Sequence, residues 1–554
     1  MLINGHGRTA PTGMGRRPTA VAWLEGLLLA AVATSYPIAA LLSANITEAE
    51  PVDGLRAWLL IASLGIFLVT ITGSLIGDPS RAGVWVAGAA LLFFSYGHVY
   101  EQVRGWSFLG LLVGRHRFLL VVFGVAFVLW GLALLRGEAS RRRLAQVVLF
   151  SLVAALMQPG ARLVSYAAPR QSAGASAAAS GLTVEQVQAR PDVYYIVLDG
   201  YGRSDILLER FGLDNNDFLE GLRERGFFVA DLAHANYSQT KLSLASSLGM
   251  THLDQLAVAL GPDSYDVRPL EDLVWHGPVL ESFRQLGYQI VSFESGYSLT
   301  RSGTADVWLA PDYGAVNERG GLLRGLALNG FESMLTETTL LRALLDLRVR
   351  QLVELQAGSA SIAYRHHRAR ILFTVEQLSG IASWSGPQFV FAHVLSPHPP
   401  FVFSDRGEPI GEDRRFTISD LNCCTEDEYR EGYRQQASFL SRIILAEIDQ
   451  ILAVSSTPPV IILQGDHGPG SLMSAGTGAD VYRERMPILN AYLLPGGETE
   501  LYPGITPINS FGIVLNHLFQ TGYELSPDRA YFSPIGRPYD LHPVDPVVLA
   551  PTAD

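Results

Sequence analysis

Residues 192–200 read DVYYIVLDG, and residues 459–468 read PVIILQGDHG. Both stretches contain a short continuous run of apolar, mostly β-branched and aromatic residues, and both end in an aspartate next to glycine. Such runs are typical of strands that are buried on both faces of a sheet. Residues 388–394 (QFVFAHV) have the same character. Together the three segments predict the centre of a sheet.

Helical patterns alternate with these strands. A helix followed by a strand recurs at 207–229, 282–293 and 429–463, and the first of these helices is expected at 207–225. This alternation predicts an α/β domain at residues 191–554, with a largely parallel central sheet covered by helices. Ligands of such sheets lie beyond the carboxyl ends of the strands.

The N-terminal third is strongly apolar. Five apolar stretches precede residue 165, at 21–42, 58–76, 84–100, 118–135 and 144–157. A helix needs about 20 mostly apolar residues to cross a bilayer, and the fifth stretch is the shortest. We therefore predict an α-helical membrane bundle of about five spans at residues 1–165, followed by an Ala/Ser/Gly-rich linker at 166–190. A cleaved signal peptide fits poorly, because four more spans follow the first.

Loop arginines predict the orientation of the bundle. They precede the first span and lie between the fourth and fifth spans, at Arg8, Arg16, Arg17, Arg136 and 141–143. The positive-inside rule makes both regions cytoplasmic. Five spans then predict a multi-pass protein of the bacterial inner (cytoplasmic) membrane, with a periplasmic or extracellular catalytic domain. The arginines at 104–117 oppose this orientation, and a fifth stretch that does not cross would leave the domain in the cytoplasm.

Composition excludes several classes of function. The chain has 554 residues and a formal net charge of −12, which divides into +6 for residues 1–165 and −18 for the remainder. An acidic C-terminal part without a basic run argues against nucleic acid as a partner. The two cysteines, Cys423 and Cys424, are adjacent, which excludes a disulfide framework or a cysteine zinc site and leaves either a vicinal disulfide or two thiols. All but one of the 41 basic residues are arginine, and the exception is Lys241.

Two strand ends carry residues that suit a metal ion. Asp199 ends the first strand, and the adjacent Asp466 and His467 follow the 459–463 strand between glycines. Carboxylates supply negative charge and an imidazole supplies a neutral nitrogen, which together suit a divalent cation. The glycines allow a close turn of the backbone. Taken alone, Asp199 would more often be a turn cap, and the glycine-rich turn could simply hold solvated charges. The buried strands that precede these residues favour a metal site.

Two further segments suit an anion. Thr240 precedes a helical run, and a hydroxyl at a helix N-terminus lies where an anion can bind, although it could equally be an ordinary N-cap. His398 lies between prolines in the loop 396–401 (SPHPPF), where it could hold a phosphate, protonate a leaving group or have no role. Arg485 could clamp a phosphate or form a structural pair. Lys241 follows Thr240 either by chance or because a compact ammonium is needed there.

This order of motifs resembles the alkaline phosphatase superfamily, and within it the membrane-anchored sulfatase-like branch of lipoteichoic acid synthases, phosphoethanolamine transferases and phosphoglycerol transferases. The resemblance covers about residues 190–540. It implies that Asp199, Thr240, Asp466 and His467 hold one divalent ion (Mn²⁺, Mg²⁺ or Zn²⁺). It also implies that Thr240 is the nucleophile, supported by Ser243, and that His398 contacts the phosphoryl group.

The sequence also departs from related classes. Thr240-Lys241-Leu242-Ser243-Leu244 lacks the Pro and Arg of the C/S-x-P-S-R signature that formylglycine sulfatases require, and the chain has no Asp-x-x-x-His for a second zinc ion. We therefore expect a metal-dependent phosphotransferase that moves a phospholipid headgroup onto an envelope glycan or lipid through a phospho-threonine intermediate. The alternatives are a hydrolase of phosphate or sulfate esters and a non-catalytic envelope-binding protein.

Overall fold

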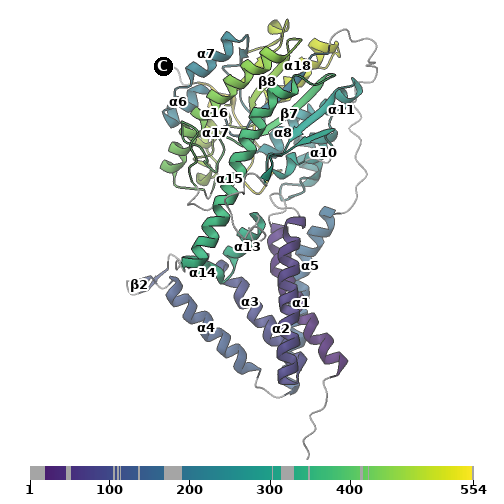
Figure 1. Ribbon diagram of the computed structural model, residues 1–554, viewed down its shortest axis with the longest axis vertical. Helices are drawn as coiled ribbons and strands as arrows, with labels where there is room; N and C mark the ends of the chain where they lie inside the picture. Colours follow the sequence, from purple (N-terminus) through teal and green to yellow (C-terminus); the bar gives the residue numbers. More distant parts are fainter. Residues whose placement is uncertain are drawn as a thin grey trace, which may run out of the picture. The chain divides into compact units, whose positions relative to one another are not determined.

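The computed structural model describes residues 19–44, 51–103, 106–108, 111–112, 114–134, 138–167, 190–301, 304–313, 330–346, 350–411, 416–421 and 423–551. The chain forms two compact units, each drawn in Figure 1. The first comprises Met1–Ala168 and Leu328–Glu354, and the second comprises Pro169–Ala327 and Leu355–Asp554. Almost all of the expected linker lies outside the described residues. The segment 328–354 lies within the expected C-terminal domain in sequence, but it belongs to the first unit.

A seven-stranded sheet forms the centre of the second unit. Its order is β4 (Phe228–Val229), β9 (Asn490–Leu493), β8 (Val460–Gly465), β3 (Val193–Leu198), β7 (Gln388–Val394), β5 (Gln289–Phe293) and β6 (Val307–Leu309). The strands from β8 to β6 are parallel, and β9 pairs antiparallel with both β8 and β4. The predicted largely parallel sheet is confirmed.

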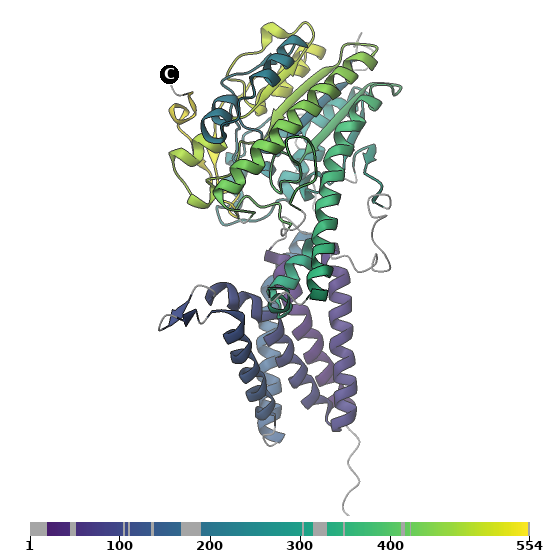
Figure 2. The same cartoon turned by 60° about the vertical axis from the view of Figure 1, so that its left-hand side comes forward.

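Helices cover both faces of this sheet (Figures 1 and 2). One face packs against α8 (Thr240–Gly249), α10 (Arg268–His276), α11 (Pro278–Gln285) and α18 (Pro507–Phe519), and the other against α6 (Ser204–Phe211), α7 (Asn216–Glu224), α15 (Arg350–Ile381) and α16 (Glu426–Val454). Along β3, Tyr195 and Val197 belong to the first core, whereas Tyr194 and Ile196 belong to the second. This alternation on a strand buried on both faces explains its continuous apolar run.

Smaller elements complete the second unit. They are α9 (Asp254–Leu260), α17 (Ala479–Arg485), α19 (Pro546–Leu549), the pair β10 (Tyr531–Phe532) and β11 (His542–Pro543), and the 3-10 turns η3 (Ser298–Thr300), η5 (Met473–Ala475) and η6 (Glu498–Glu500). Cys423 and Cys424 form a disulfide bond.

The single helix expected at 207–225 is wrong. The chain forms α6 and α7 instead, separated by residues 212–215. Gly212 has a φ of 61°, in the left-handed region that favours glycine, and it closes α6 with its N–H on the Leu208 carbonyl. The helical periodicity continues across the break because both helices face the same core, and this concealed the break in the sequence pattern.

The first unit contains five helices that are long and apolar enough to cross a membrane, as predicted. They are α1 (Ala20–Ala44), α2 (Leu55–Ile76), α3 (Pro79–Val103), α4 (His116–Ala133) and α5 (Glu138–Ala167), with η1 (Pro51–Gly54) before α2 and the pair β1 (Ser107–Phe108) and β2 (Leu111–Leu112) before α4. The fifth span is longer than the stretch 144–157 suggested. Its apolar part covers 22 residues, Arg143–Val164, which is enough to cross a bilayer.

The packing of α5 shows that it runs the length of the bundle. Near its start, Ala145 clusters with Leu29 of α1, and near its end Leu163 packs on the cluster that contains Ile38 and Leu42. Leu152 clusters with Ala33 between these points. α5 therefore lies beside α1 in the same direction, and both helices end at the same end of the bundle.

Two short helices that follow β6 in the chain join the first unit. They are α13 (Gly330–Thr338) and α14 (Leu341–Asp346). Phe331 and Leu335 cluster with apolar residues of α1, α2 and α3, and Ala343 clusters with Tyr96 and Leu119. Ion pairs join Glu332 to Arg56 and Arg342 to Glu101, the latter at 2.5 Å. These contacts lie at the end of the bundle where α1 and α3 end and α2 and α4 begin.

Candidate metal centre

The register of three adjacent strands brings the predicted ligands together. Leu198, the last residue of β3, pairs with Gly465 of β8 on one side and with Val394 of β7 on the other. Asp199 and Asp466 are the residues that follow this register. They therefore emerge side by side at the carboxyl edge of the sheet, where parallel sheets bind their ligands.

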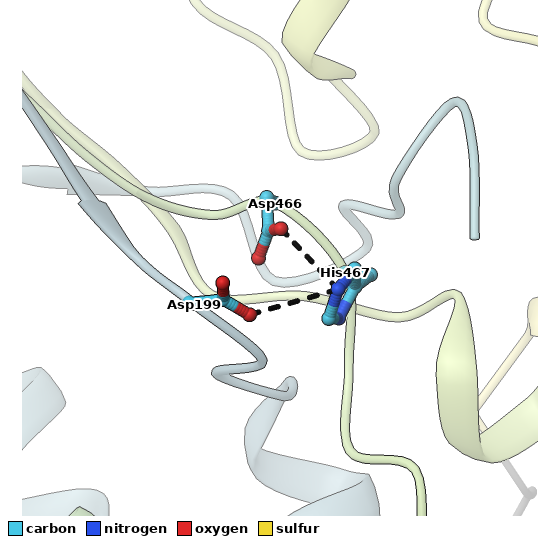
Figure 3. A group of neighbouring side chains, drawn as sticks. All are labelled: Asp199, Asp466 and His467. Carbon is cyan, nitrogen blue, oxygen red and sulfur yellow. Dashed lines mark ion pairs between the residues drawn. The ribbon is translucent and has the colours of Figure 1, made fainter. Parts of the chain in front are cut away.

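The ligating atoms converge on the ring of His467 (Figure 3). Its Nε2 atom lies 3.6 Å from Asp199 Oδ1 and 3.3 Å from Asp466 Oδ2. Thr240 Oγ1 lies 3.0 Å from the same nitrogen. All four side chains are buried. One small polar site thus forms from the three residues that follow β3 and β8 and from the first residue of α8.

Each of the three charged or aromatic ligands has one atom that is held by a hydrogen bond. The Gly200 N–H donates to Asp466 Oδ1 at 2.9 Å, and His467 Nδ1 lies 3.0 Å from the Gly468 carbonyl, which can only accept. Asp199 Oδ2 lies 3.2 Å from His393 Nε2. The remaining atoms, which we call the inner atoms, are Asp199 Oδ1, Asp466 Oδ2 and His467 Nε2.

The inner atoms fit a divalent cation. Asp199 Oδ1 and Asp466 Oδ2 are buried and accept no hydrogen bond from the described part of the chain. A buried carboxylate oxygen without a partner is costly, and a cation removes that cost. Burial and then the Arg485 charge lower the pKa of His467 to about 3, so its ring is neutral and its Nε2 has a lone pair to offer. Two carboxylates, one imidazole and one hydroxyl suit Mn²⁺, Mg²⁺ or Zn²⁺.

Glycines at the end of β8 allow this turn to form. A Cβ atom on Gly465 would lie 2.3 Å from the Tyr201 carbonyl oxygen, and one on Gly468 would lie 2.4 Å from the Glu484 carbonyl oxygen. Neither backbone oxygen can move aside cheaply, so the QGDHG turn requires glycine at both positions. This is the close backbone approach that the sequence predicted.

The start of α8 positions Thr240. The N-cap residue is Gln239, so the alternative that Thr240 is an ordinary N-cap is wrong. Its hydroxyl faces His467 instead. Ser243, one turn later, donates from Oγ to the Asp466 carbonyl at 2.6 Å and joins α8 to the metal-binding turn. Ser243 therefore ties the start of α8 to the turn after β8, and its functional support of Thr240 stays a prediction.

His398 and Arg485 lie beside this site and share a carboxylate that the sequence analysis missed. Asp420 Oδ2 lies 3.3 Å from His398 Nε2 and 3.0 Å from Arg485 Nη1, and the Tyr429 hydroxyl donates to Oδ1 at 2.8 Å. Arg485 Nη2 also lies 3.0 Å from His467 Nε2. Asp420 occupies an irregular loop without a strand before it, so no local pattern marked it.

Asp420 sets the charge of the histidine. Burial alone would lower the pKa of His398, but the Asp420 carboxylate and, after it, Asp199 outweigh burial and raise that pKa to about 9. At pH 7 the ring is therefore a cation. The same contacts show that Arg485 forms a structural pair, whereas its role as a phosphate clamp stays a prediction.

Lys241 and His393 complete the list of residues that the sequence singled out. Lys241 is half-buried at the second position of α8, and its role in substrate binding stays a prediction. His393 lies in β7, the buried strand predicted at 388–394. The structure places its ring directly against Asp199, behind the inner atoms.

Comparison with known proteins gives fold likeness only. The sequence matches no protein-family model and no curated protein. Among solved structures, the periplasmic domain of EptC from Escherichia coli is 9% identical, with a TM-score of 0.37 over 62% of this chain and 90% of that chain. The integral membrane phosphoethanolamine transferase EptA from Neisseria meningitidis is 14% identical, with a TM-score of 0.33 over 88% and 95%.

A phosphonate monoester hydrolase of Agrobacterium radiobacter is 13% identical, with a TM-score of 0.35 over 62% of this chain and 80% of that chain.

Proposed function

We propose that this protein is a membrane-bound, metal-dependent phosphotransferase that moves a phospholipid headgroup onto an envelope glycan or lipid. The observation that carries the proposal is the position of Thr240 Oγ1, which lies 3.0 Å from one of the inner atoms, His467 Nε2. Thr240 supplies the one hydroxyl of this ligand set, and an alcohol oxygen held beside a metal ion is a suitable nucleophile for a phosphodiester. One divalent ion, when bound, would lower the pKa of that hydroxyl and stabilise charge on the phosphoryl oxygens.

The reaction would take place in two steps. Thr240 Oγ forms a bond to phosphorus while the bond from phosphorus to the diacylglycerol oxygen breaks, and the diacylglycerol leaves with a proton. The product is a phospho-threonine that carries the headgroup. The hydroxyl of the acceptor then bonds to phosphorus, the bond to Thr240 Oγ breaks, and Thr240 regains its proton. Water as the acceptor would give the alternative activity, hydrolysis of phosphate or sulfate esters.

The cations beside the ligands have defined roles in this scheme. The protonated His398 ring would donate to a phosphoryl oxygen or to the departing oxygen. Arg485, held by Asp420, would present a fixed guanidinium to the same anion. Lys241 would add an ammonium beside the nucleophile. With a divalent ion bound, these three cations and the ion would outweigh the Asp199, Asp466 and Asp420 carboxylates, which agrees with a phosphodiester rather than with a neutral ester.

The membrane unit supports a lipid donor. Five helices are long and apolar enough to anchor the chain in a membrane, and a water-soluble substrate would need no such anchor. With the N-terminus in the cytoplasm, five spans would put the second unit in the periplasm or outside the cell. We therefore assign the protein to the bacterial inner membrane.

The proposal is tested by trapping the intermediate. Purified full-length protein is incubated with headgroup-labelled phospholipid and Mn²⁺, Mg²⁺ or Zn²⁺, and its intact mass is measured. We expect an added mass equal to the headgroup phosphate on the wild type and none on Thr240→Ala. Thr240→Ser, which keeps a hydroxyl, is the matched control and should form the adduct. No adduct and no turnover of any phosphodiester would leave the non-catalytic binding protein as the better hypothesis.

A further inference from the structure

The three ligands differ in what holds them. Asp466 is held by the backbone N–H of Gly200, and His467 is held by the backbone carbonyl of Gly468. Asp199 is held by a side chain, His393, with Nε2 3.2 Å from Oδ2. The carboxylate of an aspartate rotates about the Cα–Cβ and Cβ–Cγ bonds unless a partner fixes one of its oxygens. Asp199 is therefore the ligand whose orientation depends on another side chain.

A chain of side-chain contacts fixes His393 in turn. Its ring lies 3 % exposed in β7, where it pairs in register with Val197 and so faces the same side of the sheet as Asp199. His393 Nδ1 lies 3.2 Å from Thr300 Oγ1, and Thr300 Oγ1 lies 2.7 Å from Ser295 Oγ. Both hydroxyl residues are buried in the segment that follows β5.

The chemistry of these groups gives the direction of the contacts. The Asp199 carboxylate can only accept, so His393 Nε2 carries a hydrogen and donates it. Thr300 Oγ1 also lies 3.2 Å from the Tyr297 carbonyl, so the hydrogen of its hydroxyl is shared between that carbonyl and His393 Nδ1, and the Ser295 hydroxyl can donate to Thr300. The contacts follow the order of the strands, from β5 through β7 to β3. They leave Asp199 Oδ1 as the oxygen that points to His467.

We propose that His393 is a positioning residue that, with Thr300 and Ser295 behind it, orients Asp199 for metal binding. This inference rests on the proposed metal site. His393 contacts Asp199 through Oδ2, the carboxylate oxygen that is not one of the inner atoms. Partners of this kind typically change metal affinity by 10- to 100-fold when they are removed.

The test measures metal binding by the full-length protein in detergent, with Zn²⁺ alone as the probe and a competing chelator to report affinity. We expect His393→Ala to weaken Zn²⁺ binding by about 10- to 100-fold. His393→Gln keeps an N–H donor at a similar reach and should restore affinity to within a few-fold of the wild type. Thr300→Val removes the hydroxyl behind the ring while keeping its volume, and should fall between them.

The outcomes separate this inference from the proposed function. A His393→Ala protein that melts like the wild type and binds Zn²⁺ with unchanged affinity would overturn the positioning role, even if Asp466→Asn loses the metal. His393→Gln binding as weakly as His393→Ala would also overturn it, because loss of packing would then explain both. If the wild type itself binds no metal that depends on Asp466, the metal site fails, and the inference fails with it.

Discussion

Asp420 is the residue on which the charge of the site depends. Its Oδ2 atom faces two buried cationic groups, His398 and Arg485, and it is itself almost fully buried. The His398 and Arg485 charges hold the pKa of Asp420 well below its usual range against the opposing effect of burial. A carboxylate that stays ionised in this position keeps His398 protonated at neutral pH.

The pH dependence of activity tests this arrangement. If the His398 cation takes part in the reaction, kcat/KM should fall as the pH rises through about 9, the pKa of His398. Asp420→Asn removes the largest influence that raises this pKa, so the alkaline limb should move toward the ordinary histidine value near 6.5. The measurement is a pH–rate profile of both proteins.

Two results would contradict this prediction. One is an alkaline limb that stays near pH 9 in Asp420→Asn, and the other is a flat profile in the wild type.

The free energy of unfolding should depend on pH in the same direction as the activity. The folded-state pKa of His398 lies above the unfolded value, so its contribution is complete below about pH 6.5 and is lost as the pH rises through about 9. Thermal melts of Asp420→Asn report whether unpaired Arg485 also destabilises the fold.

The single lysine gives a second residue-level prediction. Lys241→Arg keeps the charge but replaces a compact ammonium with a planar guanidinium beside Thr240. We expect this change to lower turnover, whereas an Arg→Lys change at the half-exposed Arg537 should not. Initial rates on a lipid donor measure both. Equal activity in the two variants would make the position of Lys241 a chance feature of an arginine-rich chain.

At the scale of elements, the sequence predicted what depends on local pattern. Strands β3, β7 and β8 are buried on both faces, so their apolar runs were unambiguous, and the ligands at their ends followed from the geometry of parallel sheets. Contacts that depend on tertiary packing carried no such signal. Asp420 lies in an irregular loop, and the contacts of His393 with Asp199 and with Thr300 join residues that are 194 and 93 positions apart. The assignment of α13 and α14 to the first unit likewise depends on tertiary packing.

Close helix packing in the first unit yields an element-level prediction. A Cβ atom on Gly83 of α3 would lie 2.4 Å from Gly26 Cα of α1, whereas one on Gly124 of α4 would meet nothing within 4 Å. Small residues allow such close approach between membrane helices. Gly83→Val should therefore lower the melting temperature in detergent by separating α1 and α3, at a cost of roughly 1–3 kcal/mol or more. Gly124→Val is the matched control, and equal melting of the two variants would contradict the packing.

The arrangement of the whole first unit favours an odd number of spans. α5 packs beside α1 from Leu29 to Ile38. If α1 crosses the membrane, we therefore expect α5 to cross it as well. α13 and α14, which come from the chain after β6, pack at the same end of the bundle as the end of α5.

Topology provides the last prediction. Three arginines at 104–117 oppose the predicted orientation, and α4 begins at His116, between the last two of them, at the end of the bundle where α13 and α14 pack. If five spans cross, a periplasmically active alkaline phosphatase fused after residue 551 should be active, and a fluorescent protein that folds only in the cytoplasm should be dark there. Fusions at residue 77, between α2 and α3, should give the reverse result. A C-terminal fusion active only in the cytoplasm would overturn the five-span arrangement and would place the candidate metal centre on the opposite side of the membrane from an envelope acceptor.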